Sequence, residues 1–200
     1  LELGCGEGRG IDIILKKSKS FTAIDKISEI TEILSRKYPN EKFISSSFPP
    51  LQNIENESFD TLISFQVIEH IKNDKLFIKE IYRILKPGGK ALISTPNISM
   101  TLTRNPWHVR EYTSQQLFDL ASRNFKKIIM KGICGNDKIK KYYDDNKKSV
   151  MKFKRLDIFN LEKYLPNFLY KIPYEFLNRM NRNKLQANDN SLVSSITTND

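Results

Sequence analysis

Two hundred residues, 39% of them hydrophobic, suffice for one α/β domain with a sizeable core, alone or with an appendage. The sequence contains no run of about 18 apolar residues, so it predicts no membrane span. The net charge of +10 is uneven, because residues 1–130 carry 19 basic and 15 acidic side chains and residues 131–200 carry 14 and 8. This excess consists of scattered lysines, which disfavours a nucleic-acid groove.

The first ten residues, from Leu1 to Gly10, combine a short apolar run with an alternating glycine series. This pattern predicts a buried parallel strand that feeds a tight turn, where the backbone at Gly4, Gly6 and Gly8 comes close to a ligand. The chain begins inside this strand, with Leu rather than Met, so we expect a fragment that lacks an upstream segment.

Helices and strands alternate along the next 125 residues. Helices are predicted over 8–17, from an N-cap at Ser28, over 73–85, and over 114–123 with a cap at Thr113 or Ser114. Strands are predicted over 21–25, 42–45, 59–65, 90–95 and 127–134. This alternation indicates a mainly parallel sheet covered by helices on both faces, with its active surface at the carboxyl ends of the strands.

The tail has a different character. Residues 135–149 are polar and charged, and we expect them to be mobile. Residues 157–182 show aromatic-rich helical periodicity, which fits a lid over an acceptor pocket, packing against the sheet, or contact with a membrane that carries a lipid-linked substrate. Their prolines and modest length favour lid or packing. We therefore expect a core over 1–134 and a flexible segment with a helical appendage over 135–200.

The spacing of the glycines bears on the ligand. A dinucleotide fingerprint needs G-x-G-x-x-G, and that register fails at Gly4 and Gly6. Glu2 precedes the turn, and Asp25 ends the second strand 23 residues later, where a carboxylate can receive two ribose hydroxyls. With no pyrophosphate to bind, Glu2 can face an ammonium group. Two alternatives stay open, in which Glu2 caps nearby backbone and Asp25 caps the following helix.

Three stretches together resemble the class I S-adenosylmethionine-dependent methyltransferases, in the group that includes ubiquinone-pathway and small-molecule O-methyltransferases. They are Leu-Glu-Leu-Gly-Cys-Gly-Glu-Gly at 1–8, Ser-Phe-Asp-Thr-Leu-Ile-Ser-Phe-Gln-Val-Ile-Glu-His-Ile at 58–71 and Ile-Leu-Lys-Pro-Gly-Gly-Lys at 84–90. The resemblance implies a Rossmann-like, doubly wound α/β fold of the seven-stranded type with an antiparallel last strand, incomplete here at both ends. It also implies S-adenosylmethionine as cofactor.

The resemblance assigns cofactor contacts position by position. The methionine part would lie against Glu2 and the turn of Gly4, Cys5, Gly6 and Gly8, and the ribose against Asp25. Lys26 or Ile27 would flank the adenine, and Ser46 and Ser47 stand where the family has an acid or amide that binds the adenine amino group. Phe65 and Gln66 would line the methionine part and the reacting sulfonium.

The stretch from Asn105 to Thr113 resembles a segment that closes over the acceptor and supplies a histidine. Methyl transfer depends on alignment and exclusion of water, and a hydroxyl acceptor is helped by a general base. His108 is the first candidate for this base and His70 the second, although His108 could instead hold the structure near Trp107. In some relatives the position of Glu69-His70 contributes to a metal site, but two residues do not make one, so no metal is predicted.

The sequence therefore predicts a cytoplasmic S-adenosylmethionine-dependent methyltransferase that acts on a small molecule, a glycan or a lipid intermediate, with oxygen favoured as the methylated atom. Cys5 and Cys134 form no metal or disulfide pattern, which fits a reducing compartment. The alternatives are a non-catalytic cofactor-binding fold and an RNA or protein methyltransferase. The sequence predicts no membrane span, leaves peripheral membrane contact open and carries no signal for an oligomeric state.

Overall fold

The computed structural model describes residues 1–156 and 196–199. These residues fall into two units that are described separately. Unit 1 comprises residues 1–97 and 109–128, and unit 2 comprises residues 98–108 together with the described residues from 129 onward. The predicted boundary near residue 134 stays a prediction.

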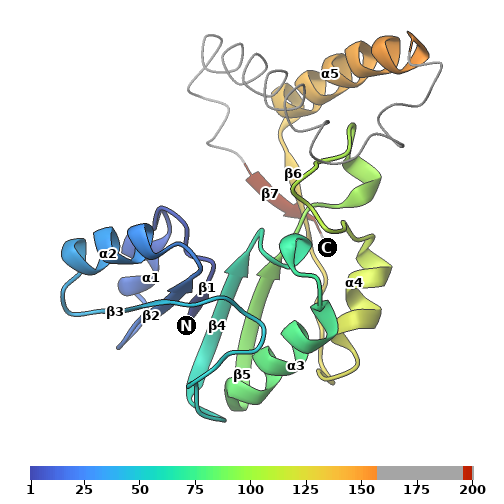
Figure 1. Ribbon diagram of the computed structural model, residues 1–200. Coiled ribbons are helices and arrows are strands. Elements are labelled where there is room, and N and C mark those ends of the chain that lie inside the picture. Colours follow the sequence, from blue (N-terminus) through green and yellow to red (C-terminus); the bar gives the residue numbers. More distant parts are fainter. Residues whose placement is uncertain (157–195, 200) are drawn as a thin grey trace. The chain divides into compact units, whose positions relative to one another are not determined.

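Unit 1 is built on a five-stranded parallel sheet with the strand order β3-β2-β1-β4-β5 (Figure 1). Its strands are β1 (Glu2–Leu3), β2 (Thr22–Asp25), β3 (Lys42–Ser45), β4 (Phe59–Phe65) and β5 (Leu85–Ser94). The order reverses between β1 and β4, which places the binding crevice at the carboxyl ends of these strands. The doubly wound parallel fold is thus confirmed. The described residues of unit 1 form a sheet of five strands, where the resemblance implied seven.

Helices cover the two faces of this sheet. The helices are α1 (Ile11–Leu15), α2 (Ser28–Lys37), α3 (Asp74–Ile84) and α4 (Ser114–Ala121), and the 3-10 helix η1 (Ile68–His70) links β4 to α3. Successive side chains of β2 point to opposite faces. Ala23 therefore joins a cluster with Ile11 and Leu34 from α1 and α2, whereas Ile24 joins one with Phe77 and its neighbours on α3.

Two of the predicted helix starts need correction. The helix expected over 8–17 is confined to α1, because the glycine turn extends to Gly10, which is its N-cap. Ser28 is the first residue of α2 rather than its N-cap, since Ile27 takes that place and donates its N–H to Asp25 Oδ1 at 3.1 Å. Thr113 caps α4 as predicted, within a complete capping box.

Unit 2 differs from the secondary structure expected for the tail, whereas the flexibility expected there stays a prediction. The stretch 135–149, expected to be mobile, contributes to a 20-residue helix, α5 (Asp137–Leu156), with ion pairs at i,i+3 spacing. The strand predicted over 127–134 is β6 (Gly132–Gly135), which starts later and pairs antiparallel with β7 (Ile196–Asn199). Unit 2 also contains the 3-10 helix η2 (Ile98–Met100). The helices expected over 157–182 lie outside the described residues.

Among the described residues, no helix combines the length and apolar character needed to cross a membrane.

Candidate functional site

The glycine turn after β1 brings the backbone into close contact with neighbouring elements. Gly4 donates its N–H to the Ile24 carbonyl at 2.8 Å, and a Cβ at Gly4 would fall on Cγ2 of Val67. Gly6 has a φ of +47°, and apart from Gly6 and its two chain neighbours no described residue has an atom within 4 Å of the position that its Cβ would take. The turn is therefore packed tightly at Gly4 and leaves open space at Gly6.

Asp25, at the carboxyl end of β2, is attached to this turn. Its side chain is buried, with Oδ2 accepting a hydrogen bond from the Gly6 N–H at 2.9 Å and Oδ1 accepting one from Ile27. The Asp25 carbonyl also accepts from the Ser46 N–H at 2.9 Å, which brings the end of β3 to the same edge. A carboxylate has about four acceptor positions, so Asp25 retains capacity for further donors such as ribose hydroxyls.

Glu2 provides an unsatisfied polar atom beside the turn. The residue is only 7% exposed, and its buried Oε2 has no hydrogen-bond partner in the part of the chain that the structure describes. Burial raises the pKa of Glu2 from 4.5 to about 6. A buried carboxylate without a partner is unfavourable, and a cationic group at this oxygen would offset that cost.

The ends of β4 and β5 are joined by Gln66. Its backbone N–H donates to the Ser94 carbonyl at 2.9 Å, and its side-chain Nε2 lies 3.2 Å from Ser94 Oγ. Gln66 has a φ of +56°, a left-handed conformation that non-glycine residues seldom adopt and that clusters at functional sites. The adjacent Phe65 is 44% exposed.

The other predicted cofactor residues differ in exposure. Lys26 and Ser47 are exposed, and the half-buried Ser46 donates its hydroxyl to the Ser47 carbonyl at 3.2 Å. Cys5 is buried within the turn, and burial, reinforced by the Asp25 and Glu2 carboxylates, raises the pKa of its thiol to about 12. A neutral thiol of this kind is a packing group rather than a nucleophile.

The two candidate bases belong to different units. His70 is exposed in η1 of unit 1, where its backbone N–H donates to the Val67 carbonyl at 2.9 Å. His108 lies in unit 2, with its Nε2 at 2.8 Å from Nδ2 of Asn105. Since Asn105 Oδ1 accepts from the Trp107 N–H, its amide group faces the ring and makes Nε2 the acceptor. This bond supports the structural alternative for His108, whose role as a base stays a proposal.

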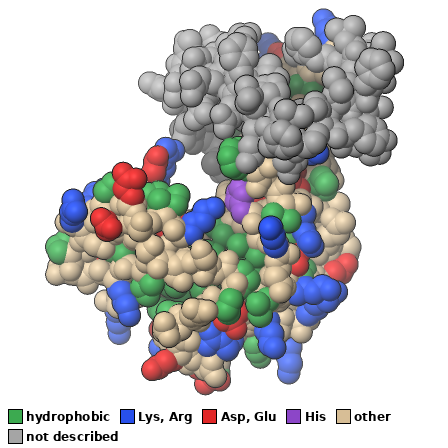
Figure 2. All heavy atoms as spheres, in the orientation of Figure 1, with side chains coloured by type: hydrophobic (Ala, Val, Ile, Leu, Met, Phe, Trp, Pro, Cys, Tyr) green, Lys and Arg blue, Asp and Glu red, His purple; other side chains and the backbone are tan. Residues whose placement is uncertain are grey.

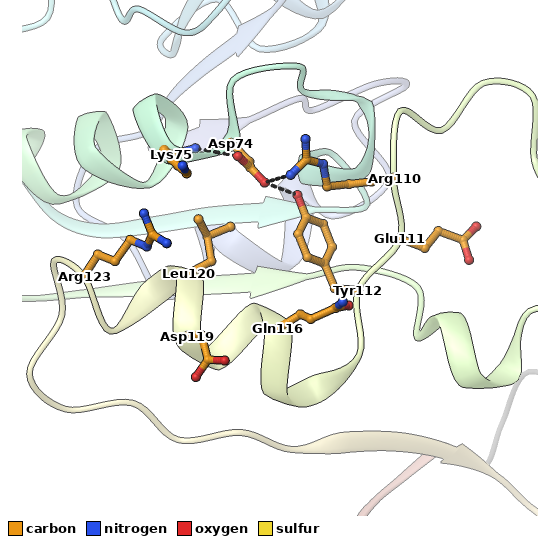
Figure 3. A pocket seen from close by; sticks show the side chains of 9 residues that line it. All are labelled: Asp74, Lys75, Arg110, Glu111, Tyr112, Gln116, Asp119, Leu120 and Arg123. Carbon is orange, nitrogen blue, oxygen red and sulfur yellow. Dashed lines mark hydrogen bonds and ion pairs between the residues drawn. The ribbon is translucent and has the colours of Figure 1, made fainter.

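A second polar cluster was not foreseen from the sequence. It consists of Asp74 with Arg110 and Tyr112, beside a pocket of about 320 Å³ between the start of α3 and α4 (Figure 3). Asp74 follows the N-cap Asn73, so its sequence position is that of an ordinary acid in the first turn of a helix. Its partners Arg110 and Tyr112 lie 36 and 38 residues further along the chain. No local sequence pattern predicts a pairing over this distance.

Comparison with known proteins agrees with this architecture. Residues 1–93 match a family model described as a methyltransferase domain. A probable S-adenosylmethionine-dependent methyltransferase of Mycolicibacterium smegmatis is 34% identical over 125 residues, which cover 60% of this chain and 48% of that protein. The mitochondrial ubiquinone biosynthesis O-methyltransferase of Rattus norvegicus is 29% identical over 104 residues, which cover 48% of this chain and 30% of that protein. The chain thus spans half or less of the length of these relatives.

Solved structures share the fold at low sequence identity. An S-adenosylmethionine-dependent methyltransferase from Mesorhizobium loti aligns with a TM-score of 0.56 and 15% identity, covering 66% of this chain and 74% of that chain. An arsenic(III) S-adenosylmethionine methyltransferase from Chlamydomonas reinhardtii aligns with a TM-score of 0.56 and 20% identity, covering 66% and 54%. On the family match, the relatives and the fold together, residues 1–93 are similar to the methyltransferase domain of S-adenosylmethionine-dependent methyltransferases.

Proposed function

We propose that the protein transfers a methyl group from S-adenosylmethionine to a small-molecule, glycan or lipid-intermediate acceptor, with oxygen as the methylated atom. The observation that carries this proposal is the buried, unpartnered Oε2 of Glu2 beside a glycine turn with open space at Gly6. A ligand that combines an ammonium group with a ribose would satisfy Glu2 and use the remaining acceptor positions of Asp25.

The residues at the carboxyl edge would divide the binding between them. Glu2 would accept hydrogen bonds from the ammonium group, and the Gly4–Gly8 turn with Cys5 would enclose the methionine part. Asp25, held in place by the Gly6 N–H, would accept from the ribose hydroxyls. The remaining contacts fall to Lys26, Ser46 and Ser47 at the adenine and to Phe65 and Gln66 at the methionine. When bound, S-adenosylmethionine supplies an activated methyl group on a sulfonium.

The proposed acceptor class draws support from the similarity to the rat enzyme, whose name describes O-methylation in ubiquinone biosynthesis. A hydroxyl acceptor benefits from a general base within hydrogen-bond reach. His108 is our first candidate for this base and His70 the second. Because Asn105 donates to His108 Nε2, that bond would have to open before Nε2 could receive a proton.

The charge distribution and the thiols bear on partners and compartment. On the face shown in Figure 2, basic and acidic side chains of unit 1 are interspersed rather than gathered into one band. This supports a small-molecule acceptor over a nucleic acid, whose binding proteins carry a concentrated basic patch. The sequence positions of Cys5 and Cys134, which match no metal-site spacing and no disulfide framework, support a reducing, cytoplasmic compartment.

Calorimetric titration with S-adenosylhomocysteine tests the cofactor half of the proposal. We expect Asp25→Ala to weaken binding at least about tenfold, because charge-assisted hydrogen bonds contribute about 1.5–3 kcal/mol. Asp60→Ala is the matched control, since this exposed aspartate lies near the amino end of β4 and pairs with Lys86 at 2.9 Å. Equal affinities in the wild type and Asp25→Ala would contradict the assigned site.

Turnover tests the second half. Methyl transfer from labelled S-adenosylmethionine to a panel of hydroxylated small molecules and glycan and lipid intermediates should be detectable, and His108→Ala should lower its rate about 10²–10⁴-fold if His108 is the base. Binding without turnover over a broad panel, with His108→Ala silent, would instead support the non-catalytic alternative. A steep salt dependence of RNA binding would support the nucleic-acid alternative.

A further inference from the structure

Residues 98–108, which contain His108, leave unit 1 after Asn97 and return to it at Val109. We call them the acceptor segment, in keeping with the proposed function. The chain on either side of this segment is joined within unit 1, because Asn97 and Tyr112 form a parallel β-bridge. The segment is therefore an excursion whose two ends are brought together at one place.

Glu69 contacts both the outgoing and the returning chain. Its side chain is 1% exposed, and its Oε2 accepts a hydrogen bond from Thr95 Oγ1 at 3.0 Å, just before the segment begins. Its backbone carbonyl accepts from the N–H groups of Val109 and Arg110 at 2.7 and 3.3 Å, just after the segment ends. One buried residue thus holds the two ends, with its side chain on one and its backbone on the other.

Asp74 fixes the returning end a second time (Figure 3). It is 5% exposed, and its Oδ2 accepts hydrogen bonds from Arg110 Nη1 at 2.7 Å and from the Tyr112 hydroxyl at 2.9 Å. Its Oδ1 accepts from the N–H of Lys75 at 2.8 Å, which fixes the carboxylate on the first turn of α3. Burial and the Asp74 carboxylate raise the pKa of Tyr112, so its hydroxyl remains a donor.

Glu69 and Asp74 accept hydrogen bonds from groups at the two ends of the acceptor segment. The side chain of Glu69 binds the outgoing end at Thr95, its carbonyl binds the returning end, and Oδ2 of Asp74 binds the returning end again. The Asn97–Tyr112 bridge then connects the outgoing end to a residue that Asp74 holds. Two buried carboxylates, each bound by hydrogen-bond donors, therefore restrain the two neighbouring ends of the acceptor segment.

We propose that Glu69 and Asp74 are positioning residues that hold together, within unit 1, the two ends of the acceptor segment, which carries His108, the first candidate for the general base in the proposed methyl transfer. This inference rests on the proposed function for its catalytic meaning. The restraint on the segment itself can be tested without knowing the acceptor.

The chain contains a single tryptophan, Trp107, and it lies inside the acceptor segment, 49% exposed. Its fluorescence therefore reports on this segment alone. The decisive variants are Tyr112→Phe, which removes one hydroxyl, and Asp74→Asn, which removes the charge. Glu80→Gln is the matched control, because Glu80 is another buried acid of α3 but binds Arg83 and the Leu51 N–H instead.

We expect Asp74→Asn and Tyr112→Phe to raise the acrylamide quenching constant of Trp107 about twofold and to lower its fluorescence anisotropy. The reason is that the two ends of the acceptor segment would separate locally. The affinity for S-adenosylhomocysteine should stay within about twofold of the wild type, since neither residue belongs to the proposed cofactor site. Glu80→Gln should leave the quenching constant unchanged.

Unchanged quenching and anisotropy in folded Tyr112→Phe would overturn the proposal, and so would an equal rise in Glu80→Gln. If Asp74→Asn does not fold, Tyr112→Phe decides alone. The proposed function fails separately, when the wild type does not bind S-adenosylhomocysteine, and that result leaves the Trp107 measurement intact.

Discussion

The N–H of Gly6 donates to Oδ2 of Asp25 at 2.9 Å, so the turn after β1 and the carboxyl end of β2 form one bonded unit. The bond links the residue that leaves space for a ligand to the carboxylate proposed to bind its ribose. The position of the missing Cβ of Gly6 is open in the described part of the chain, with only its own chain neighbours within 4 Å, whereas Asp25 is buried and already accepts two backbone donors. Shape and charge at this edge are therefore determined together.

Gly6→Ala should separate ligand binding from folding. Gly6 has a φ of +47°, so we expect alanine to lower the free energy of unfolding by about 1–2 kcal/mol. Its methyl group would enter the open space, and we expect affinity for S-adenosylhomocysteine to fall at least about tenfold, because a cofactor there would have to shift. Urea unfolding and calorimetry measure the two effects.

Gly88→Ala is the control for this substitution. Gly88 has a φ of +80°, and among the described residues no atom beyond its own chain neighbours lies within 4 Å of its missing Cβ, but it lies within β5. The Gly88→Ala variant should lose about as much stability as Gly6→Ala and should keep the wild-type affinity for S-adenosylhomocysteine. Equal losses of affinity in the two variants would mean that Gly6 acts only through stability.

Glu2 should make both stability and cofactor binding depend on pH. Burial raises its pKa from 4.5 to about 6, so the folded state favours the protonated carboxyl. Its contribution to stability is therefore fully present below pH 4.5 and is lost as the pH rises through about 6, a change of about 2 kcal/mol at 1.36 kcal/mol per pKa unit. Glu2→Gln should gain stability relative to the wild type over that interval.

Ligand binding should show the opposite dependence. An ammonium group prefers the ionised carboxylate, so affinity for S-adenosylhomocysteine should rise as the pH passes through about 6 in the wild type but not in Glu2→Gln. Glu7→Gln, an exposed acid of the same turn that pairs with Arg9, should behave like the wild type. An identical pH profile in Glu2→Gln would exclude Glu2 as the ammonium acceptor.

The sequence was informative wherever function depends on the ends of parallel strands. Asp25 could be placed beside the glycine turn because the carboxyl ends of adjacent parallel strands meet at one edge, and the sheet order brings β2 next to β1. The hydrophobic periodicity of α3 and the strand β4 were predicted within a residue of their observed bounds. Each of these features is encoded by a local pattern.

Features that depend on distant pairing were not predictable in the same way. Asp74 meets Tyr112 from 38 residues away, and neither residue signals the other. β7 consists of Ile-Thr-Thr-Asn and pairs through its backbone, so a polar stretch without alternation still forms a strand opposite β6. The helix α5 escaped prediction because its mostly polar and charged composition resembles that of a mobile segment.

The two cysteines should react at very different rates. The pKa of about 12 at Cys5 leaves about a thousandfold less thiolate at pH 8 than an ordinary thiol has, and the side chain is buried. Cys134 is partly exposed in β6 and serves as the internal control. Alkylation followed by peptide mass analysis should label Cys134 first, and both equally in guanidinium. Rapid labelling of Cys5 in the folded protein would show that the glycine turn opens readily.

A comparison of Gln66→Gly with Gln66→Ala tests whether glycine relieves backbone strain just after β4. With a φ of +56°, Gln66→Gly should raise the free energy of unfolding by about 1 kcal/mol relative to Gln66→Ala, the reverse of the order expected in a regular strand. Both variants lose the same hydrogen bond from Nε2 to Ser94 Oγ, so their difference isolates the backbone. Urea unfolding of the pair measures it. An alanine variant as stable as the glycine variant would mean that the turn adjusts its backbone without cost, and the left-handed conformation would then carry no strain to connect with function.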